Sequence, residues 1–595
     1  MKMKMKMNMK KILISLSVIL IVALLAGCGK TDKSIKTSPE AESSTSTPMA
    51  LSANVTDRDK NTAWIESDTR ITLDNSSISV SGTGATSNGK VVTITKEGTY
   101  VISGTISDGQ IVIAATNSDK VHLVLNGADI TNKTGAPIYS SQCDKLIITL
   151  AEGTKNVLTD GSSNFQYANT EEEPNAALFS KDDLTINGTG SLIVNAGFKN
   201  GICSKDDLLI VSGDISVNAA NHGIRGNDSV TILNGNIDIV AVNDGIQTNN
   251  TEDTSLGWIL IENGTVTITA GHDGIQADTQ VSIYDGEFSI TTGENSSSST
   301  DSDSYKGIKS TTDIIITGGS FVIDSEDDGV HANGNIKIDG GTFTISSGDD
   351  GIHADGNLTV NSGTIKIVEA YEGLEAAKLA INGGAINIVS SDDALNAAGG
   401  KDQSGGGGRF GMDMFAANSA YDITISGGSI NFLAGGDGMD SNGTVNITGG
   451  ETVAIINSSP DNGAIDANGT TTFTGGIIIY GGTGTGSTPN NDSTQSYVYV
   501  SSEITAGNEI SVKKDGQTLI AYTPETNLRS LALSSPDIKS GESYEIYSGD
   551  SLLSTVTAGT GGGGWMNGPG QMGTPGGRGG RGGEGNPGMK DPGRR

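Results

Sequence analysis

Short runs of alternating apolar and polar residues fill the middle of the chain, and Gly, Asn or Asp separates one run from the next. Residues 351–354 (Gly-Ile-His-Ala), 357–360 (Asn-Leu-Thr-Val) and 363–367 (Gly-Thr-Ile-Lys-Ile) show the full pattern. Alternation with a period of two is typical of β-strands that bury one face. Three such strands joined by three corners predict one coil of a parallel β-helix, with Ile, Val, Leu and Phe pointing inward.

A polar pair followed by Gly-Ile, or by a close variant, recurs through this region. Its small residue is Gly201, Gly223, Gly245, Gly274, Gly307, Gly329, Gly351, Gly373, Ala394, Gly438 and Gly463. The steps are 22, 22, 29, 33, 22, 22, 22, 21, 44 and 25 residues, and we interpret the step of 44 as two periods. A fixed period with insertions predicts a solenoid. Strands must form it, because each glycine would destabilise a helix by about 1 kcal/mol. We therefore predict an all-β fold with coils of about 22 residues, stacked about 4.8 Å apart.

The first residues resemble a lipoprotein signal peptide. Five lysines among the first eleven residues precede an apolar run from Ile12 to Leu25, and Leu25-Ala26-Gly27-Cys28 ends the segment. This predicts a signal peptide at 1–27 and lipidation of Cys28, which would anchor the protein to the outer face of the cytoplasmic membrane of a Gram-positive-type bacterium. The lipid would be its only membrane contact.

The rest of the chain divides by composition. Residues 28–50 predict a flexible tether, and residues 51–490 predict the β-helix, with a Gly-rich insertion at 399–420. Residues 491–560 lose the glycine rhythm and predict a small β module or cap. Residues 561–595 are rich in Gly, Arg and Pro and predict a disordered tail.

Composition narrows the function. The chain of 595 residues has 85 glycines, 4% aromatic residues and a net charge of -32. Such a charge argues against nucleic-acid binding, because a protein that binds phosphate must be locally basic. It favours cations, or a surface that cations bridge. Apart from Cys28, the chain has only Cys143 and Cys203, too few for a disulfide framework. We expect the protein to be a monomer.

Aspartates stack at one corner of successive coils. Because carboxylates one coil apart repel each other, such a row favours bound cations, and hard oxygen ligands select Ca²⁺. The alternative is that Asp and Asn only favour the turn while Gly supplies a positive φ. The predicted calcium ligands are Asp244, Asp273, Asp327, Asp328, Asp349, Asp350, Asp392, Asp393 and Asp437.

The residue after each Gly-Ile forms a second row, which faces outward if the Ile and the Ala two positions later face inward. Polar groups repeated at every coil suit an extended polymer better than a single pocket does. The alternative is an ordinary solvated face. The predicted carbohydrate-binding residues are Arg225, Gln247, Gln276, Lys309, His331, His353 and Glu375.

The sequence gives weaker support for two further kinds of site, a transition-metal site and a catalytic base. His331 and His353 lie in adjacent coils and are two candidate ligands of a transition metal, without an evident third. Lys306 and Lys309 stand beside acidic corners and are candidate bases, although each is more simply a balancing charge. The sequence contains no Ser-His-Asp set, P-loop or zinc signature.

Several phrases, in this order, resemble a known family. They are 98–104 (Gly-Thr-Tyr-Val-Ile-Ser-Gly), 123–130 (Leu-Val-Leu-Asn-Gly-Ala-Asp-Ile), and the twin phrases Ser-Lys-Asp-Asp-Leu at 180–184 and 204–208. The chain resembles, from about Ile71 to Gly481, the secreted clostridial and bacillar carbohydrate-binding domains formerly described as a domain of unknown function.

The resemblance implies a right-handed parallel β-helix similar to family 9 pectate lyases. It also implies bound calcium and attachment to polygalacturonate and cellulose. The calcium ligands it implies are Asp244, Asp273, Asp327, Asp328, Asp349 and Asp350.

Two functions follow, and we favour the first. A binding module would bridge calcium between its corners and a uronate polymer, since weak contacts at many coils add up. A calcium-dependent polysaccharide lyase would instead use Lys306, Lys309 or Arg225 as the base. The third alternative is a structural adhesin or spacer without affinity for glycans. We favour no catalytic residue and expect a protein that is not an enzyme.

Overall fold

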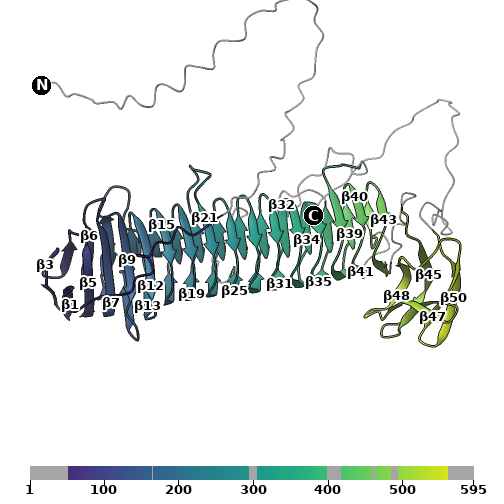
Figure 1. Cartoon of the computed structure of the whole chain (residues 1–595), viewed down its shortest axis with the longest axis horizontal. Helices are drawn as coiled ribbons and strands as arrows, with labels where there is room; N and C mark the ends of the chain where they lie inside the picture. The colour runs from purple at the N-terminus through teal and green to yellow at the C-terminus, as the bar shows by residue number, and fades with distance from the viewer. Residues whose placement is uncertain are drawn as a thin grey trace, which may run out of the picture. The chain divides into compact units, whose positions relative to one another are not determined.

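The computed structural model describes residues 51–163, 165–293, 304–397, 417–457, 462–483 and 493–559. Every element in these ranges is a β-strand, and the strands stack coil upon coil (Figure 1). Parallel pairing links each strand to its counterpart one coil away, so that the strands form three columns. The predicted all-β parallel β-helix is confirmed.

The first column contains the repeated Gly-Ile motifs. Its strands are β6 (Gln110–Ala114), β8 (Ile138–Gln142), β11 (Ala176–Ser180), β14 (Asn200–Ser204), β17 (Ile224–Gly226), β20 (Ile246–Thr248), β23 (Ile275–Ala277), β26 (Ile308–Ser310), β29 (Val330–Ala332), β36 (Leu395–Ala397), β39 (Met439–Ser441) and β42 (Asp466–Ala467). Four long strands span two columns: β5 (Gly98–Ile106) and β7 (Lys120–Thr131) belong to the second and third, and β32 (Ile352–Val360) and β34 (Leu374–Ile381) to the first and second.

The other two columns complete each coil. The second holds β9 (Lys145–Leu150), β12 (Asp183–Gly188), β15 (Asp207–Ile210), β18 (Ser229–Ile232), β21 (Trp258–Ile261), β24 (Val281–Ile283), β27 (Ile314–Ile316), β30 (Ile336–Ile338), β37 (Asp422–Ile425), β40 (Thr444–Ile447) and β43 (Thr471–Phe473). The third holds β10 (Lys155–Thr159), β13 (Ser191–Ala196), β16 (Asp214–Ala219), β19 (Asn236–Ala241), β22 (Thr265–Ala270), β25 (Glu287–Thr292), β28 (Ser320–Ser325), β31 (Thr342–Ser347), β33 (Thr364–Glu369), β35 (Ala385–Ser390), β38 (Ser429–Ala434), β41 (Glu451–Ile456) and β44 (Ile477–Gly482).

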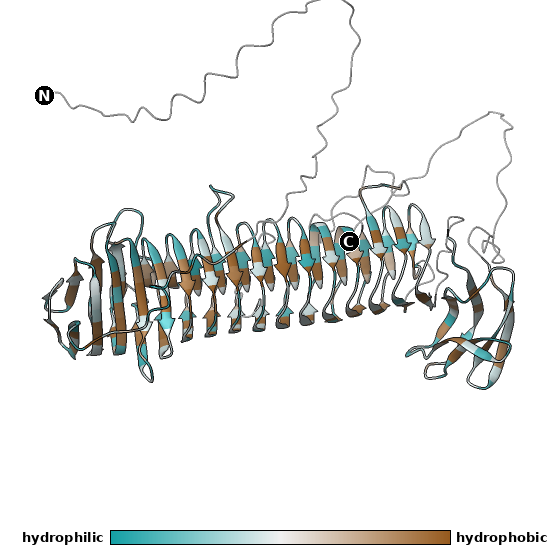
Figure 2. Ribbon diagram, viewed as in Figure 1, coloured by the Kyte–Doolittle hydropathy of each residue, from teal (hydrophilic) through white to brown (hydrophobic). Residues whose placement is uncertain are grey.

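Like residues stack along the core. Apolar and polar positions alternate along the strands, as Figure 2 shows, and the inward set is fully buried. In the third column the rings of Phe288, Phe321 and Phe343 stack on one another, with centroids 4.7 and 4.6 Å apart. The 22-residue period therefore places each inward side chain on its equivalent in the next coil.

The phrase glycines are required by close packing rather than by a left-handed backbone. A Cβ on Gly329 would lie 2.6 Å from the carbonyl oxygen of Gly351 and 2.6 Å from Ile345 Cγ2. The φ angle of Gly329 is not in the positive region. The sequence-based explanation by positive φ is therefore wrong at this corner. Positive φ occurs at the corner before the third column instead, as at Gly341 (φ +99°).

The step of 44 residues is one coil, not two. Leu395 of β36 pairs directly with Met439 of β39, and β37 pairs with the second half of β34. Strand β36 ends at Ala397, and the next described strand of the stack, β37, begins at Asp422. The period of two coils was wrong because the Gly-rich insertion happens to match the length of one coil.

Both ends of the stack carry antiparallel strands. At the first coils, β1 (Thr69–Asn75) pairs with β2 (Ser77–Ser81), and β3 (Ala85–Asn88) pairs with β4 (Val91–Ile94). At the last coil, β48 (Leu528–Ser534) pairs antiparallel with both β44 and β45 (Tyr497–Ile504). A separate sheet follows, made of β46 (Ile510–Lys514), β47 (Gln517–Tyr522), β49 (Ser543–Ser548) and β50 (Ser551–Thr557).

The C-terminal strands cover the outer face of the last coils. Val453, Ile455 and Ile479 point away from the β-helix core and pack against Val498 and Leu533 of the C-terminal strands. This explains why β41 and β44 are buried on both faces and lose the strict alternation of the other strands.

Residues 51–63 run along the outer face of the second column as a clasp. The Asp59 carboxylate is fully buried, where Thr185 Oγ1 donates to it at 2.8 Å and Lys145 Nζ pairs with it at 3.2 Å. Further along, Tyr284 donates to the backbone oxygen of Leu51 at 2.9 Å.

Several predicted segments lie outside the described residues: the signal peptide, Cys28 and the tether (1–50), residues 398–416 of the insertion, and the tail from 560 to 595. No helix long and apolar enough to cross a membrane occurs in the ranges that the structure describes. Cys143 and Cys203 are both free and buried, so they form no disulfide.

Candidate functional site

The first column aligns the two predicted rows. The outer row is the set of residues that directly follow the Ile, or its equivalent, of each repeated Gly-Ile motif. Neighbouring members pair in register between strands of successive coils. Its members are Cys203, Arg225, Gln247, Gln276, Lys309, His331, His353, Glu375, Asn396 and Asp440. The corner column is the set of residues directly before the Gly, or Ala394, of each Gly-Ile motif: Asn200, His222, Asp244, Asp273, Lys306, Asp328, Asp350, Glu372, Asp393 and Asp437.

One carboxylate oxygen of the corner column holds the next coil. The backbone N–H of Asp273 donates to Asp244 Oδ1 at 3.1 Å, and that of Lys306 donates to Asp273 Oδ1 at 2.9 Å. The backbone N–H of Asp350 donates in the same way to Asp328 Oδ1 at 3.0 Å. The corner aspartates therefore accept hydrogen bonds that join successive coils, whether or not a cation is bound.

The second oxygen meets the outer row. Gln247 Nε2 donates to Asp244 Oδ2 at 2.8 Å, and Lys309 Nζ pairs with Asp273 Oδ2 at 3.2 Å. His331 Nδ1 lies 2.7 Å from Asp328 Oδ2. The two rows thus form one polar network, in which Asp244 and Asp328 contact the outer-row residue three positions later and Asp273 contacts Lys309 of the next coil.

Lys306 neutralises the corner at Asp327 and Asp328. It is 3% exposed, and its Nζ lies 3.0 Å from Asp327 Oδ2 and 2.7 Å from Asp328 Oδ2. Burial alone would raise the pKa of Asp328, but the hydrogen bond from His331 and the charge of Lys306 lower it below its ordinary value. The lysine and arginine side chains of the network, Arg225, Lys306 and Lys309, all lie before Asp350.

The following coils are acidic. No lysine or arginine in the described ranges forms an ion pair with Glu372, Glu375, Asp392 or Asp393. Burial and the charge of Glu375 raise the pKa of Glu372 to about 8. Burial, with the charges of Asp440 and Asp392, raises the pKa of Asp393 to about 8 despite the backbone hydrogen bond from Asp437. Burial also raises the pKa of Asp437.

We call Glu372, Asp392, Asp393 and Asn396 the acidic corner. Asn396 is 5% exposed, and its Nδ2 donates to Glu372 Oε2. Its Oδ1 is buried and has no hydrogen-bond partner. A neutral oxygen without a donor beside several carboxylates fits a hard cation such as Ca²⁺, which takes mixed carboxylate and amide oxygens. The acidic corner therefore offers carboxylate and amide oxygens, the kinds of ligand that calcium takes.

In the described residues, four groups bring potential metal ligands within 4.8 Å of one another, and the acidic corner is not among them. The first two are Asp328, His331 and His353, and Asp350, His353 and Glu375; the third is Asp327, Asp328 and Asp349. A fourth group, Asp183, Asp206 and Asp207, lies in the twin phrases of the second column. Lys306 already balances two carboxylates of the third group, and Lys145 pairs with Asp183 at 3.3 Å.

The outer row is less accessible than an extended binding surface would be. His331 and His353 are 3% and 1% exposed. Arg225, Gln247, Gln276, Lys309 and Glu375 are half-buried. The half-buried members can therefore contact a polymer, while the two histidines are buried.

Tyr371 is an exposed aromatic residue that the prediction of binding residues missed. It precedes Glu372, its side chain is 48% exposed, and a hydrogen bond with Asp392 raises its pKa to about 12. An amphipathic ring of this kind offers both an apolar face and a polar edge. The available sequence feature was the corner itself, where Tyr371-Glu372 stands in place of the Asp-Asp pair of neighbouring coils.

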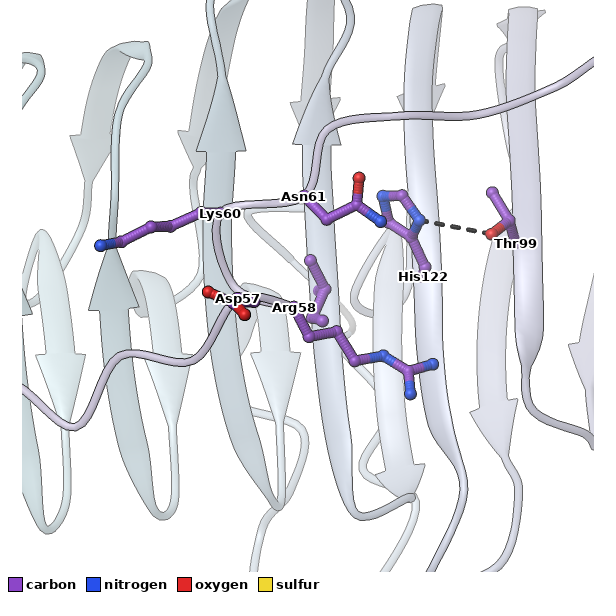
Figure 3. A pocket seen from close by; sticks show the side chains of 7 residues that line it. Asp57, Arg58, Lys60, Asn61, Thr99 and His122 are labelled. Carbon is purple, nitrogen blue, oxygen red and sulfur yellow. Dashed lines mark hydrogen bonds between the residues drawn. The ribbon is translucent and has the colours of Figure 1, made fainter.

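A cavity of about 640 Å³ lies elsewhere, between the clasp and the second column (Figure 3). Asp57, Arg58, Lys60, Asn61, Thr99, His122 and Ile147 line it. His122 is hydrogen-bonded through both ring nitrogens, to Thr99 at 3.4 Å and to Thr149 at 2.7 Å. Burial lowers its pKa to about 4, so this histidine is neutral and structural.

Comparison with known proteins finds a family model that matches part of the chain. Residues 88–351 match the family model described as carbohydrate-binding domain-containing protein. A carbohydrate-binding domain-containing protein of Acetivibrio thermocellus is 41% identical over 152 residues, which is 25% of this chain and 53% of that protein. A solved structure, the polysaccharide lyase-like protein from C. thermocellum as a gadolinium derivative, is 42% identical, with 38% of this chain and 92% of that chain covered and a TM-score of 0.37.

The chain is thus similar to the carbohydrate-binding domain family over residues 88–351, somewhat less than half of its length. The predicted family resemblance is confirmed. The chain spans about half the length of the curated relative that it matches. The matched residues 88–351 include the corner at Asp328 but end before the acidic corner.

Proposed function

We propose that this chain is a calcium-dependent carbohydrate-binding lipoprotein that attaches the cell surface to an acidic polysaccharide such as polygalacturonate, to cellulose, or to both. The observation that supports calcium is the acidic corner, where Glu372 and Asp393 have raised pKa values and the buried Asn396 Oδ1 has no hydrogen-bond partner. Removing such charges from water is unfavourable unless a cation or protons balance them.

The acidic corner would work by bridging. Calcium accepts six to eight oxygen ligands, so an ion that Glu372 and Asp393 hold would have positions left for the carboxylate of a uronate unit. Tyr371 stands at the same corner with nearly half of its side chain exposed and would pack against the sugar ring. Half-buried members of the outer row, such as Gln276 and Lys309, would add weaker contacts at earlier coils.

The lyase alternative is disfavoured by the surroundings of its candidate bases. A base must release its proton before it can take one from the substrate. Lys306 is enclosed by two carboxylates at 2.7 and 3.0 Å, and Lys309 Nζ is held by Asp273 at 3.2 Å and Ser304 at 3.0 Å. Both carboxylate pairs stabilise the ammonium form. Arg225 remains half-buried at an earlier coil.

The test is co-sedimentation of the full chain with insoluble polygalacturonate or cellulose, in calcium and in chelator, with absorbance of unsaturated sugar products followed in parallel. Binding that requires calcium, without new absorbance, would support the binding module. A Glu372→Gln/Asp393→Asn variant should lose calcium-dependent binding, whereas Asp324→Asn, an exposed carboxylate of β28, should bind normally. Product absorbance would establish a lyase, and absence of both signals would favour the adhesin or spacer.

Surface anchoring rests on the predicted lipidation of Cys28. Replacement of Cys28 by Ala should move the protein from the membrane fraction of the producing cell to the medium. Persistence of the Cys28→Ala protein in the membrane fraction would overturn the anchor.

A further inference from the structure

The coil that follows Lys306 and Asp328 contains a buried histidine whose ring nitrogens make no hydrogen bond. His353 is 1% exposed, and neither Nδ1 nor Nε2 has a hydrogen-bond partner. Leaving a buried polar group unsatisfied costs about 1–3 kcal/mol. An uncharged imidazole would ordinarily donate from one nitrogen and accept at the other.

Carboxylates surround this ring without hydrogen-bonding geometry. From His353 Nδ1, Asp350 Oδ2 lies at 3.1 Å, Glu375 Oε2 at 3.4 Å and Asp328 Oδ2 at 3.7 Å. Of these, Asp328 is already occupied by Lys306 and His331. His353 Nδ1 therefore faces the carboxylates of Asp350 and Glu375.

We propose that Asp350, His353 and Glu375 form a binding site for a divalent transition metal of the zinc type, separate from the calcium of the acidic corner. The donor set supports this class of metal, because imidazole nitrogen suits zinc, copper and nickel, whereas calcium takes oxygen ligands. One His and two carboxylates leave a fourth tetrahedral position for a water or a sugar hydroxyl.

The distances agree with this ligand geometry. Zinc binds nitrogen and carboxylate oxygen at about 2.0–2.2 Å, so that two ligand atoms on a tetrahedron lie about 3.3–3.6 Å apart. The observed distances from His353 Nδ1, 3.1 Å to Asp350 Oδ2 and 3.4 Å to Glu375 Oε2, are close to this ligand-to-ligand distance. The three side chains would need little movement to bind the ion.

The metal-free electrostatics are also consistent. Burial, together with the charge of Asp328, raises the pKa of Asp350 well above its ordinary value. Burial and the hydrogen bond with Asp350 raise the pKa of Glu375 to about 8. A divalent cation would replace the protons that these carboxylates otherwise keep.

The experiment is a cobalt titration of the full chain after metal removal. We expect one equivalent of Co²⁺ to give a visible absorption band, which Zn²⁺ abolishes and an equal concentration of Ca²⁺ does not. His353→Gln should weaken binding at least about tenfold. The control is His222→Gln, because His222 also lies beside a corner aspartate, with Nδ1 3.1 Å from Asp244 Oδ2.

Glu375→Gln provides a second variant of similar size in case His353→Gln does not fold, which circular dichroism would reveal. Glu375→Gln should also lose the cobalt band. Three results would overturn the proposal: no band in the unmodified chain, cobalt binding by His353→Gln and Glu375→Gln equal to that of the unmodified chain, or displacement of cobalt by equimolar Ca²⁺. The inference does not rest on the proposed carbohydrate function, since cobalt binding is measured without polysaccharide.

Discussion

At the scale of single residues, Lys306 shows how one side chain changes the meaning of a motif. The Asp-Asp-Gly corner at Asp327 and Asp328 looks like its neighbour at Asp349 and Asp350, yet Lys306 from the preceding coil places its ammonium group between the first two carboxylates. A lysine therefore balances the pair Asp327 and Asp328. In the described residues, no lysine forms an ion pair with Asp350 of the next coil.

Replacing Lys306 by Met should destabilise the protein by about 3–5 kcal/mol, because it leaves the buried Asp328 and the half-buried Asp327 without their cation. The measurement is chemical denaturation in chelator. Lys337→Met is the control: its pair with Asp339 is exposed and contributes at most about 1 kcal/mol. Equal losses for the two variants would contradict the structural role of Lys306.

Tyr371 belongs to the same scale. Tyr371→Ala should weaken polysaccharide binding by about 1–2 kcal/mol, roughly five- to thirtyfold in Kd, because the exposed ring is lost. Tyr371→Phe keeps the ring and should retain most of the affinity. Affinity electrophoresis with polygalacturonate in the gel would compare the variants, and a Tyr371→Ala protein that binds normally would exclude the ring from the site.

At the scale of elements, stacked side chains make each column a ladder. Phe321 of β28 lies between Phe288 and Phe343, with both neighbouring rings less than 5 Å away. Phe321→Ala should cost about 3–5 kcal/mol through the cavity that it creates, measured as a lower denaturant midpoint. Val322→Ala, on the exposed face of the same strand, should change stability by less than about 0.5 kcal/mol. A loss at Val322 as large as that at Phe321 would mean that the faces of β28 are misassigned.

The acidic coils give stability a pH dependence. The pKa values of Glu372, Glu375 and Asp393 are raised to about 8 in the folded state, from about 4 in the unfolded chain. Between these values the folded state binds more protons, so the free energy of unfolding falls as pH rises, by up to about 1.4 kcal/mol per pH unit for each group. Metal-free protein should therefore melt at a lower temperature at pH 8 than at pH 5.

Calcium should flatten this dependence, because a cation replaces the protons and stabilises the state that binds it. The Glu372→Gln/Asp393→Asn variant should show a flatter dependence even without calcium. Calorimetry at several pH values tests both. A metal-free melting temperature that rises toward pH 8 would show that the carboxylates are balanced by groups other than a cation.

At the scale of the whole described molecule, the two ends of the stack are closed by antiparallel strands. β48 pairs with β44, and the apolar cluster around Val498 and Leu533 covers outward residues of β41 and β44. A β-helix needs such closure because an open last coil presents unpaired backbone groups to other chains.

Deletion of residues 493–595 should therefore cause aggregation, seen as high-mass species in light scattering. Deletion of 560–595 alone removes none of the described pairing strands and should leave the protein monomeric. A monomeric protein after the longer deletion would show that the C-terminal strands are an appendage and not a cap.

Part of the site followed directly from the sequence. The outer row pairs in register from Cys203 to Asp440, as the phrase predicted, because a period of two determines which side chain faces outward and a period near 22 determines its neighbour in the next coil. The corner column was found for the same reason. Both depend only on distance along the chain.

Only the tertiary structure decided what those rows do. It showed that corner aspartates use one oxygen to hold the next coil, that Lys306 balances one acidic pair, and that His331 and His353 are buried. It also showed that the step from Ala394 to Gly438 is a single coil. Rotamers, burial and contacts between coils determine these properties, and spacing along a chain carries no information about them. The sequence by itself determined the solenoid and its aligned rows, while packing between coils determined which charges remain for a ligand.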